Sequence, residues 1–225
     1  MVVHLPFTDR LEAGRLLAKE LALHKLQDAV VLGLARGGVP VAFAVADRLH
    51  LPLDVIVARK LGVPWQPELA MGAIAGMAWI LDGRMIRELG ISDEDVEEIA
   101  AREHAEMMRR EELYREGEPA LDLHGRAAIL VDDGLATGST MLAAVRHARG
   151  LKAARVVIAI PVGSMQACDR LRGEADDLVC LATPELFFAV GEWYRDFRQV
   201  SDSEVRKLLA ESQRRSRELT IASEA

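Results

Sequence analysis

Two adjacent carboxylates and a cluster of small hydroxyl residues lie close together in the segment ILVDDGLATGST, residues 129–140. The apolar run that opens it is typical of a buried strand, which would bring Asp132 and Asp133 to the strand's carboxyl end. The sequence TGST at 137–140 then begins a helix, where backbone N–H groups, hydroxyls and a glycine form a cradle for one phosphate group. Because the two acids can accept hydrogen bonds from vicinal sugar hydroxyls, the segment predicts a ribose 5-phosphate site. The alternative is an ordinary capped strand-to-helix turn, but adjacent acids on a buried strand are costly without a purpose.

The elements that would position this segment alternate between strands and helices. Short apolar runs predict five strands, at 29–35, 53–58, 126–131, 155–160 and 177–182. Apolar periodicity and capping residues predict helices at 8–25, 39–50, 92–116, 138–149, 164–172 and 201–217. Residues 59–69, with two prolines and a glycine, are expected to form a loop, and 70–81 a β-hairpin. This order predicts an α/β fold with a central, mostly parallel five-stranded sheet flanked by helices, in one domain spanning 1–225.

The charge of the chain is concentrated in one segment. The chain has 28 basic and 35 acidic residues, a formal net charge of −7, and residues 92–118 hold 11 acids and 4 bases, also a net −7. The remainder is therefore neutral, which argues against a nucleic-acid-binding surface. A solvated helix at the edge of the fold is the favoured interpretation of 92–116, and a helix that docks a protein partner is the alternative.

Other function classes find little support in the sequence. No apolar run approaches the ~20 residues of a membrane span, and no signal peptide is evident, so a cytoplasmic location is expected. Two cysteines exclude a disulfide scaffold, and six scattered histidines have no zinc-ligand spacing. The GxGxxG, P-loop and GxSxG motifs are absent.

Residues 129–140 resemble the phosphoribosyl-pyrophosphate (PRPP) motif of the type I phosphoribosyltransferases, and the chain is similar to a poorly characterised bacterial group of predicted members over about residues 28–200. The resemblance implies a type I phosphoribosyltransferase-like fold with a small hood, and it assigns Asp132, Asp133, Arg59 and Lys60 to the catalytic site. The long helix at 92–116 is an insertion into the generic pattern. The resemblance also implies Mg²⁺, held through PRPP near the two acids. The residues that would bind the 5-phosphate are Ala136, Thr137, Gly138, Ser139 and Thr140.

Two further loops follow the family's order. The loop after the first strand would bind pyrophosphate through Ala35, Arg36, Gly37 and Gly38. After the second strand, Arg59 and Lys60 would reach the diphosphate, and residues 61–69 would form a mobile loop that closes over the site. Each signal alone is weak, because an RGG turn is common and the two basic residues fit equally well as solvated charges.

The base-binding region is the least specific part of the resemblance. Phe187 or Phe188, in the segment 183–200, is the candidate for stacking on a base, with burial in the core as the alternative; Trp65 is another candidate. Ala136 stands where 6-oxopurine enzymes carry an aspartate, which puts that substrate class in doubt. Candidates for a general base are Glu68, Glu192 and Asp196.

The resemblance implies a Mg²⁺-dependent phosphoribosyltransferase that transfers the 5-phosphoribosyl group of PRPP to a nitrogenous base or similar small nucleophile, releasing pyrophosphate. A non-catalytic PRPP-binding regulator is the first alternative, and a scaffold that docks another chain through 92–116 is the second. The expected partners are PRPP and a small-molecule acceptor, without nucleic acid or membrane. A homodimer is the default expectation for an oligomer.

Overall fold

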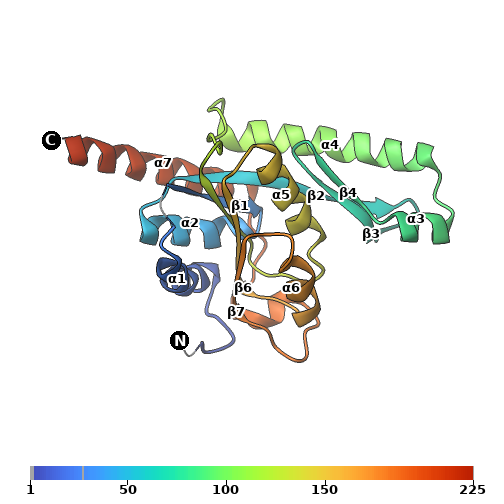
Figure 1. Ribbon diagram of the computed structural model, residues 1–225, viewed down its shortest axis with the longest axis horizontal. Coiled ribbons are helices and arrows are strands. Elements are labelled where there is room, and N and C mark those ends of the chain that lie inside the picture. Colours follow the sequence, from blue (N-terminus) through green and yellow to red (C-terminus); the bar gives the residue numbers. More distant parts are fainter. Residues whose placement is uncertain (1–2, 27, 225) are drawn as a thin grey trace.

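A seven-stranded sheet forms the centre of the protein, in the order β4-β3-β2-β1-β5-β6-β7 (Figure 1). The computed structural model describes residues 3–26 and 28–224. The strands are β1 Ala29–Ala35, β2 Leu53–Val63, β3 Gln66–Ala75, β4 Ala78–Leu81, β5 Ala127–Val131, β6 Arg155–Val162 and β7 Asp177–Ala182. The helices are α1 Arg10–Leu21, α2 Gly38–Leu49, α3 Gly83–Leu89, α4 Asp93–Arg115, α5 Ser139–Gly150, α6 Met165–Leu171 and α7 Asp202–Glu224, with 3₁₀ turns at Ala22–His24 and Val190–Trp193.

The five strands predicted from apolar runs are all present, and they pair in parallel. β1 lies at the centre, where Val31 is aligned with Leu53 of β2 and with Ile129 of β5. Both faces of such a strand are covered, which explains its continuous apolar run. The sheet has two strands more than the five expected, because the predicted hairpin, β3 and β4, adds to the edge of β2 in antiparallel pairing.

The expectation of a loop at 59–69 is wrong. β2 continues to Val63, and β3 begins at Gln66, so only Pro64 and Trp65 form the turn. Leu61 and Val63 are buried at 0% and 1% exposure, which stabilises the extended arm. Register shifts on both sides of Gly62 place its backbone against Pro67, where a Cβ would lie 2.2 Å from the proline carbonyl oxygen. A bulge at a glycine thus accommodates the proline that suggested a loop.

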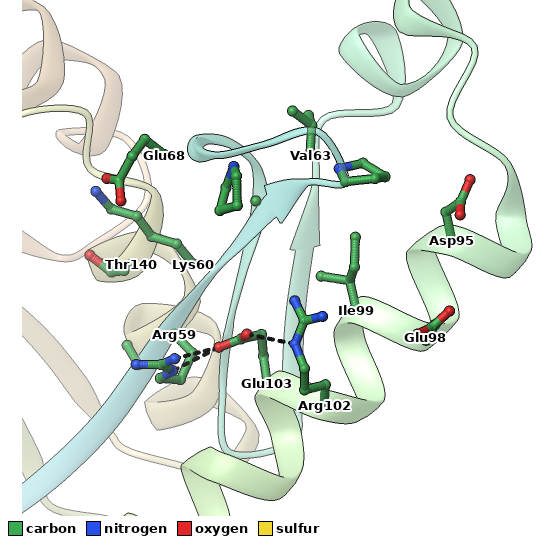
Figure 2. Close-up of a pocket in the computed structure, with 14 residues that line it drawn as sticks. Arg59, Lys60, Val63, Glu68, Asp95, Glu98, Ile99, Arg102, Glu103 and Thr140 are labelled. Carbon is green, nitrogen blue, oxygen red and sulfur yellow. Dashed lines mark hydrogen bonds and ion pairs between the residues drawn. The ribbon is translucent and has the colours of Figure 1, made fainter.

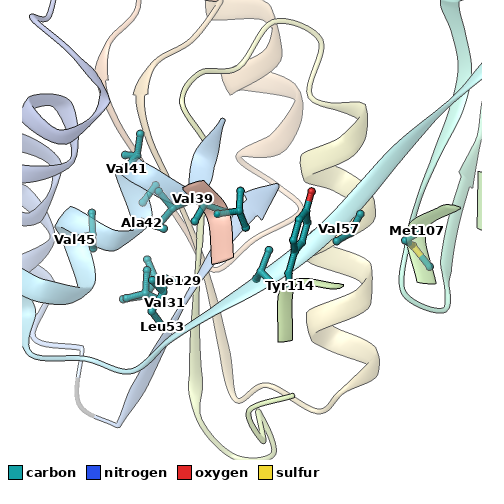
Figure 3. Close-up of a cluster of buried hydrophobic side chains, with 14 of the residues drawn as sticks. Val31, Val39, Val41, Ala42, Val45, Leu53, Val57, Met107, Tyr114 and Ile129 are labelled. Atoms are coloured by element: carbon teal, nitrogen blue, oxygen red, sulfur yellow. The ribbon is translucent and has the colours of Figure 1, made fainter. Parts of the chain in front are cut away.

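Helices cover both faces of the sheet. On one face, α1, α2, α4 and α7 enclose the core that contains Val31, Val57 and Ile129 (Figure 3). On the other face, α5 and α6 cover Leu130 and Ile158. The helix predicted at 201–217 is longer than expected, since α7 extends to Glu224, and its C-terminal part projects from the body of the fold (Figure 1).

The acidic segment forms the expected helix, α4, which begins after the N-cap Ser92 and packs against β2. Its outer face is exposed, as a helix at the edge of the fold requires. Its inner face buries Met107 and Tyr114 at 0% and 2% exposure (Figure 3). Each such side chain contributes roughly 1.5–3 kcal/mol on burial. The structure therefore holds α4 firmly against the sheet.

Two glutamates on α4 differ from the expectation of a solvated helix. The side chains of Glu103 and Glu111 are only 14% and 16% exposed, and they pair with Arg59 and Arg115 respectively. Their charges are thus balanced at the contact with β2 rather than in solvent.

The segment 183–200, which we call the hood, follows β7 and packs against the N-terminal residues. Phe7 donates its backbone N–H to the carbonyl of Trp193, and its own carbonyl accepts from Arg195, both at 2.8 Å. The rings of Phe7 and Tyr194 lie 5.4 Å apart. These contacts bring the start of α1 beside the carboxyl ends of the central strands. Within the described residues, no helix has the length and apolar character that a membrane span requires.

Candidate functional site

The two predicted acids lie where β5 ends, at the carboxyl edge of the parallel strands. The last strand residue is Val131, and Asp132 and Asp133 follow it directly. The Asp133 backbone N–H donates to Oδ1 of Asp132 at 2.9 Å, which fixes the orientation of the first carboxylate. In parallel α/β sheets this edge is the usual place for ligands.

Burial makes this pair electrostatically costly. Burial, and then the neighbouring Asp133 charge, raise the pKa of Asp132 well above its ordinary value. Burial raises the pKa of Asp133 as well, although the Arg10 guanidinium opposes that shift. Concentrated negative charge of this kind is common where a protein binds cations or hydroxyl donors.

The loop that follows the acids is held by the next strand. Leu135 donates its backbone N–H to the carbonyl of Val162 at 2.9 Å, and the Ser164 hydroxyl donates to the carbonyl of Ala136 at 2.8 Å. Gly138 is the N-cap of α5 with a φ of +81°, a conformation that favours glycine, and no side chain of the described residues caps the helix there. Amide N–H groups at the start of α5 are thus left for a ligand, as a phosphate cradle requires.

The predicted 5-phosphate residues surround this helix start. Ala136 and Thr137 are exposed, Gly138 is buried, and Ser139 and Thr140 are half-buried in the first turn of α5. All five residues therefore lie at, or directly before, the start of α5.

The loop between β1 and α2 packs directly onto the acids. A Cβ added at Gly37 would lie 2.1 Å from Oδ2 of Asp133, and one at Gly38 would lie 2.8 Å from Cα of Asp132. Only glycine permits this approach, so the two predicted loops form one surface. The loop also contains a cis peptide bond between Ala35 and Arg36.

Arg36, the predicted cation of this loop, is a neighbour of α7. Its Nη1 lies 3.6 Å from Oδ1 of Asp202, at the start of that helix. Both side chains are partly exposed, at 27% and 37%, and a pair of this kind is weak. An anion at the loop could therefore compete with Asp202 for the guanidinium.

Arg59 and Lys60 point to opposite faces of β2, because successive strand residues alternate. Arg59 faces α4 and donates from Nε and Nη2 to Oε2 of Glu103, at 2.9 and 2.6 Å. Lys60 lies on the other side with Thr140 and Glu68 (Figure 2). Lys60 is near enough to Asp132 to lower that carboxyl's pKa, opposing the effect of burial. The structure thus brings Lys60, but not Arg59, toward the predicted PRPP loop.

A cavity of about 650 Å³ lies beside this part of β2 (Figure 2). Its walls include Lys60 and Thr140 at one end and Glu98 and Arg102 of α4 at the other. The acids Asp132 and Asp133 do not line it. The cavity is therefore a neighbour of the predicted ribose site on the side of β2, rather than the ribose site itself.

The aromatic candidates for base stacking have different environments. Phe187 is half-buried and stacks on Trp193 with ring centroids 6.3 Å apart, whereas Phe188 is 79% exposed. Trp65 is 61% exposed at the β2–β3 turn. Phe187 thus already has an aromatic partner, and Phe188 and Trp65 present free surface.

The candidates for a general base are dispersed. Glu68 is exposed and lines the cavity beside β2, while Glu192 is exposed in the hood. Asp196 is bound by Arg198 at 2.7 Å, and that hydrogen bond lowers its pKa. A carboxylate held in this way is a poor proton acceptor at neutral pH.

Sequence reasoning missed two charged residues at the site. Arg10, at the start of α1, binds Asp133, and Glu103 of α4 binds Arg59. A signal for Arg10 was present: it lies three, four and seven residues before the buried Ala13, Gly14 and Leu17, on the same face of α1.

The fold and the site define an α/β protein with two contacting loops, the predicted phosphate-binding loops, at the carboxyl ends of parallel strands. Residues 8–195 match the family model described as a phosphoribosyl transferase domain, and the chain belongs to this family.

Solved and curated proteins are similar to the chain. The crystal structure of TT1426 from Thermus thermophilus matches with a TM-score of 0.79 and 43% identity, covering 92% of this chain and 99% of that one. Two Mycobacterium tuberculosis proteins, from strains H37Rv and CDC 1551 and both named as candidate phosphoribosyl transferases, are each 50% identical over 201 residues. These matches cover 88% of this chain but 45% of the relatives, so the chain spans less than half their length.

Proposed function

We propose that this chain binds PRPP with Mg²⁺ and transfers the 5-phosphoribosyl group to a nitrogenous base or a similar small nucleophile, releasing pyrophosphate. The observation that carries the proposal is the contact between two loops. Asp132 and Asp133, at the end of β5, lie directly against Gly37 and Gly38, at the end of β1. Two acids that can bind sugar hydroxyls, in contact with a loop whose amides can bind an anion, fit a substrate whose ribose carries a diphosphate.

Each end of PRPP would meet a distinct part of the surface. The 5-phosphate would accept hydrogen bonds from N–H groups at the start of α5 and from the hydroxyls of Thr137, Ser139 and Thr140, aided by the helix dipole. The diphosphate would lie along the amides of residues 36–38, next to Lys60. Arg59 would reach it only after leaving Glu103.

The donor set near the acids fits Mg²⁺. This ion prefers oxygen ligands and is usually held by one or two carboxylates together with substrate phosphates. Among the residues that the structure describes, no group of three or more His, Cys, Asp or Glu side chains could hold a metal ion alone. The half-buried carboxylate of Asp132, whose pKa is raised, would favour a cation beside it. Bound with PRPP, Mg²⁺ would neutralise charge on the departing diphosphate.

The chain's own residues would act mainly by positioning. Fixing the 5-phosphate at α5 and the diphosphate at residues 36–38 would hold the ribose in place while the bond at C1 breaks. The loop amides and Lys60 would stabilise the negative charge that develops on the leaving diphosphate. Asp132 would accept a hydrogen bond from a ribose hydroxyl, and C1, as it becomes positively charged, would be attacked by a nitrogen nucleophile from the opposite face.

A pyrophosphate-release assay tests the proposal. The protein would be incubated with Mg²⁺-PRPP and, in turn, adenine, guanine, hypoxanthine, uracil and small primary amines. We expect release that depends on one acceptor class and is lost in Asp132→Asn. Binding of PRPP without release of pyrophosphate for any acceptor would instead support the regulatory alternative. If the protein neither binds PRPP nor releases pyrophosphate, the assignment of a PRPP site to these residues is contradicted.

A further inference from the structure

The two adjacent acids have different partners. Nε of Arg10 donates to Oδ2 of Asp133 at 2.8 Å, and the two side chains are only 10% and 14% exposed. For Asp132, the described residues include no cation within ion-pair distance, and its Oδ1 accepts only the neighbouring backbone N–H of Asp133 at 2.9 Å. One carboxylate is thus neutralised inside the protein, and the other is not.

Arg10 is itself fixed from several sides. Its Nη1 donates to the backbone carbonyl of Arg198 at 2.9 Å, and its guanidinium lies 4.0 Å from the ring centroid of Phe197. A planar guanidinium that is both stacked and hydrogen-bonded has little freedom to move. Arg10 therefore connects α1 and the hood to the acid pair.

The second acid is also covered from the opposite direction. The backbone of Gly37 lies so close to Oδ2 of Asp133 that a Cβ there would be 2.1 Å away. The Tyr194 hydroxyl donates to the backbone carbonyl of Asp133 at 2.6 Å. Arg10 and Gly37 thus both lie against Oδ2 of Asp133, Tyr194 holds its backbone, and the side chain is only 14% exposed, so its carboxylate is less open to a sugar hydroxyl.

We propose that Arg10 is a positioning residue: it holds the Asp133 carboxylate away from the ligand, so that Asp132 alone meets the ribose hydroxyls of PRPP. This inference rests on the proposed function of the site. It assigns the two acids of the motif separate roles. Arg10 and Asp133 form an ion pair that holds the loop in place, and Asp132 contacts the ribose hydroxyls.

A structural role for Arg10 and a positioning role predict different effects of its removal on PRPP affinity. If the ion pair only tied α1 to the hood, its removal would lower stability while the remaining folded protein bound PRPP normally. If Arg10 positions the acids, affinity itself must fall in the folded protein. Partners of ligand-binding groups typically change affinity or activity 10–100-fold when removed.

The test is a double-mutant cycle on Arg10 and Asp133. The variants are Arg10→Met, Asp133→Asn and the combination of both, with Arg10→Lys as the conservative change. Arg15→Met, which alters an exposed arginine on the same helix, is the control. Isothermal titration calorimetry would give the dissociation constant for Mg²⁺-PRPP, and circular dichroism with urea unfolding would confirm that each variant is folded.

We expect Arg10→Met to weaken Mg²⁺-PRPP binding roughly tenfold or more, with partial recovery in Arg10→Lys and no change in Arg15→Met. The combined variant should bind no more weakly than the worse single variant, because both changes remove one interaction. Wild-type affinity in folded Arg10→Met, or additive losses, would overturn the inference while leaving the proposed function intact. A wild-type protein that does not bind PRPP would overturn both.

Discussion

Arg59 of β2 donates two hydrogen bonds to a single carboxylate oxygen of Glu103 on α4, at 2.6 and 2.9 Å. The contact joins the acidic helix α4 to the strand that carries Lys60. Arg59 and Glu103 are 29% and 14% exposed, so the pair is partly shielded from water. Helix α4 thus holds Arg59 on the face of β2 opposite to Lys60.

Replacing Glu103 with glutamine should destabilise the protein by about 1–2 kcal/mol, because Arg59 keeps its charge but loses the charged partner. Urea unfolding monitored by circular dichroism measures this change. Glu97→Gln, on the exposed face of the same helix, should lie within ~0.5 kcal/mol of wild type. Equal midpoints for all three proteins would show that the pair contributes nothing to the docking of α4.

Gly37→Ala should abolish PRPP binding and destabilise the protein. A Cβ at this position would lie 2.1 Å from Oδ2 of Asp133, so the loop or the acid must move. We expect a loss of about 1–3 kcal/mol, as for other overpacked sites, and no thermal shift with Mg²⁺-PRPP. The matched control is Gly173→Ala, since a Cβ there has no neighbour within 4 Å. A Gly37→Ala protein that binds normally would contradict the close contact between the two loops.

Asp132→Asn should make the ligand-free protein more stable at neutral pH, by about 1 kcal/mol. Burial and the Asp133 charge raise the pKa of Asp132 above its unfolded value. Such a carboxyl stabilises the fold when protonated at low pH, and this contribution is lost as pH rises through the folded-state pKa. Above the unfolded-state pKa the Asp132 carboxyl therefore costs folding free energy, and the amide removes this cost.

Asp133→Asn should instead make the ligand-free protein less stable. Asp133→Asn leaves Arg10 buried without its charged partner, so its unfolding midpoint should fall below that of wild type. Urea midpoints measured without ligand would establish the order of the three proteins. An Asp132→Asn protein less stable than Asp133→Asn would contradict the assignment of separate roles to the two acids.

The parallel core could be predicted because its strands are buried on both faces. The predicted strand at 29–35 has the bounds of β1, and that at 177–182 the bounds of β7. In both, a short apolar run is bounded by polar or turn-forming residues, which is a local signal. The candidate site residues at 132–140 could be placed at a strand end for the same reason, because they follow a strand of this type.

The β2–β3 arm could not be recognised by the same approach. Pro64, Pro67 and Gly62 are strong loop signals, and they outweighed the alternation of Leu61 and Val63 on one face. The bulge that accommodates Pro67 depends on pairing between strands, which the local sequence does not reveal. The short helix α3 was missed as well, because its seven residues follow the hairpin without a clear apolar stripe.

The partners of the charged residues required the tertiary structure. The acidic composition of 92–116 suggested a solvated helix, but Glu103 of this helix lies opposite Arg59 and pairs with it. Arg10 and Asp133 are 123 residues apart in the chain and meet only because the hood packs on α1. Ion pairs of this kind follow from topology rather than from spacing.

The most direct test of the central claim is a thermal shift with Mg²⁺-PRPP, run on wild type and on Asp132→Asn. Ligand at ~100 times its dissociation constant adds about 2.7 kcal/mol to the stability of the folded state. For a domain of this size we expect an increase of roughly 5–10 °C in the wild-type Tm and none in Asp132→Asn. No shift in the folded wild type, or equal shifts in both proteins, would contradict the assignment of PRPP binding to this site.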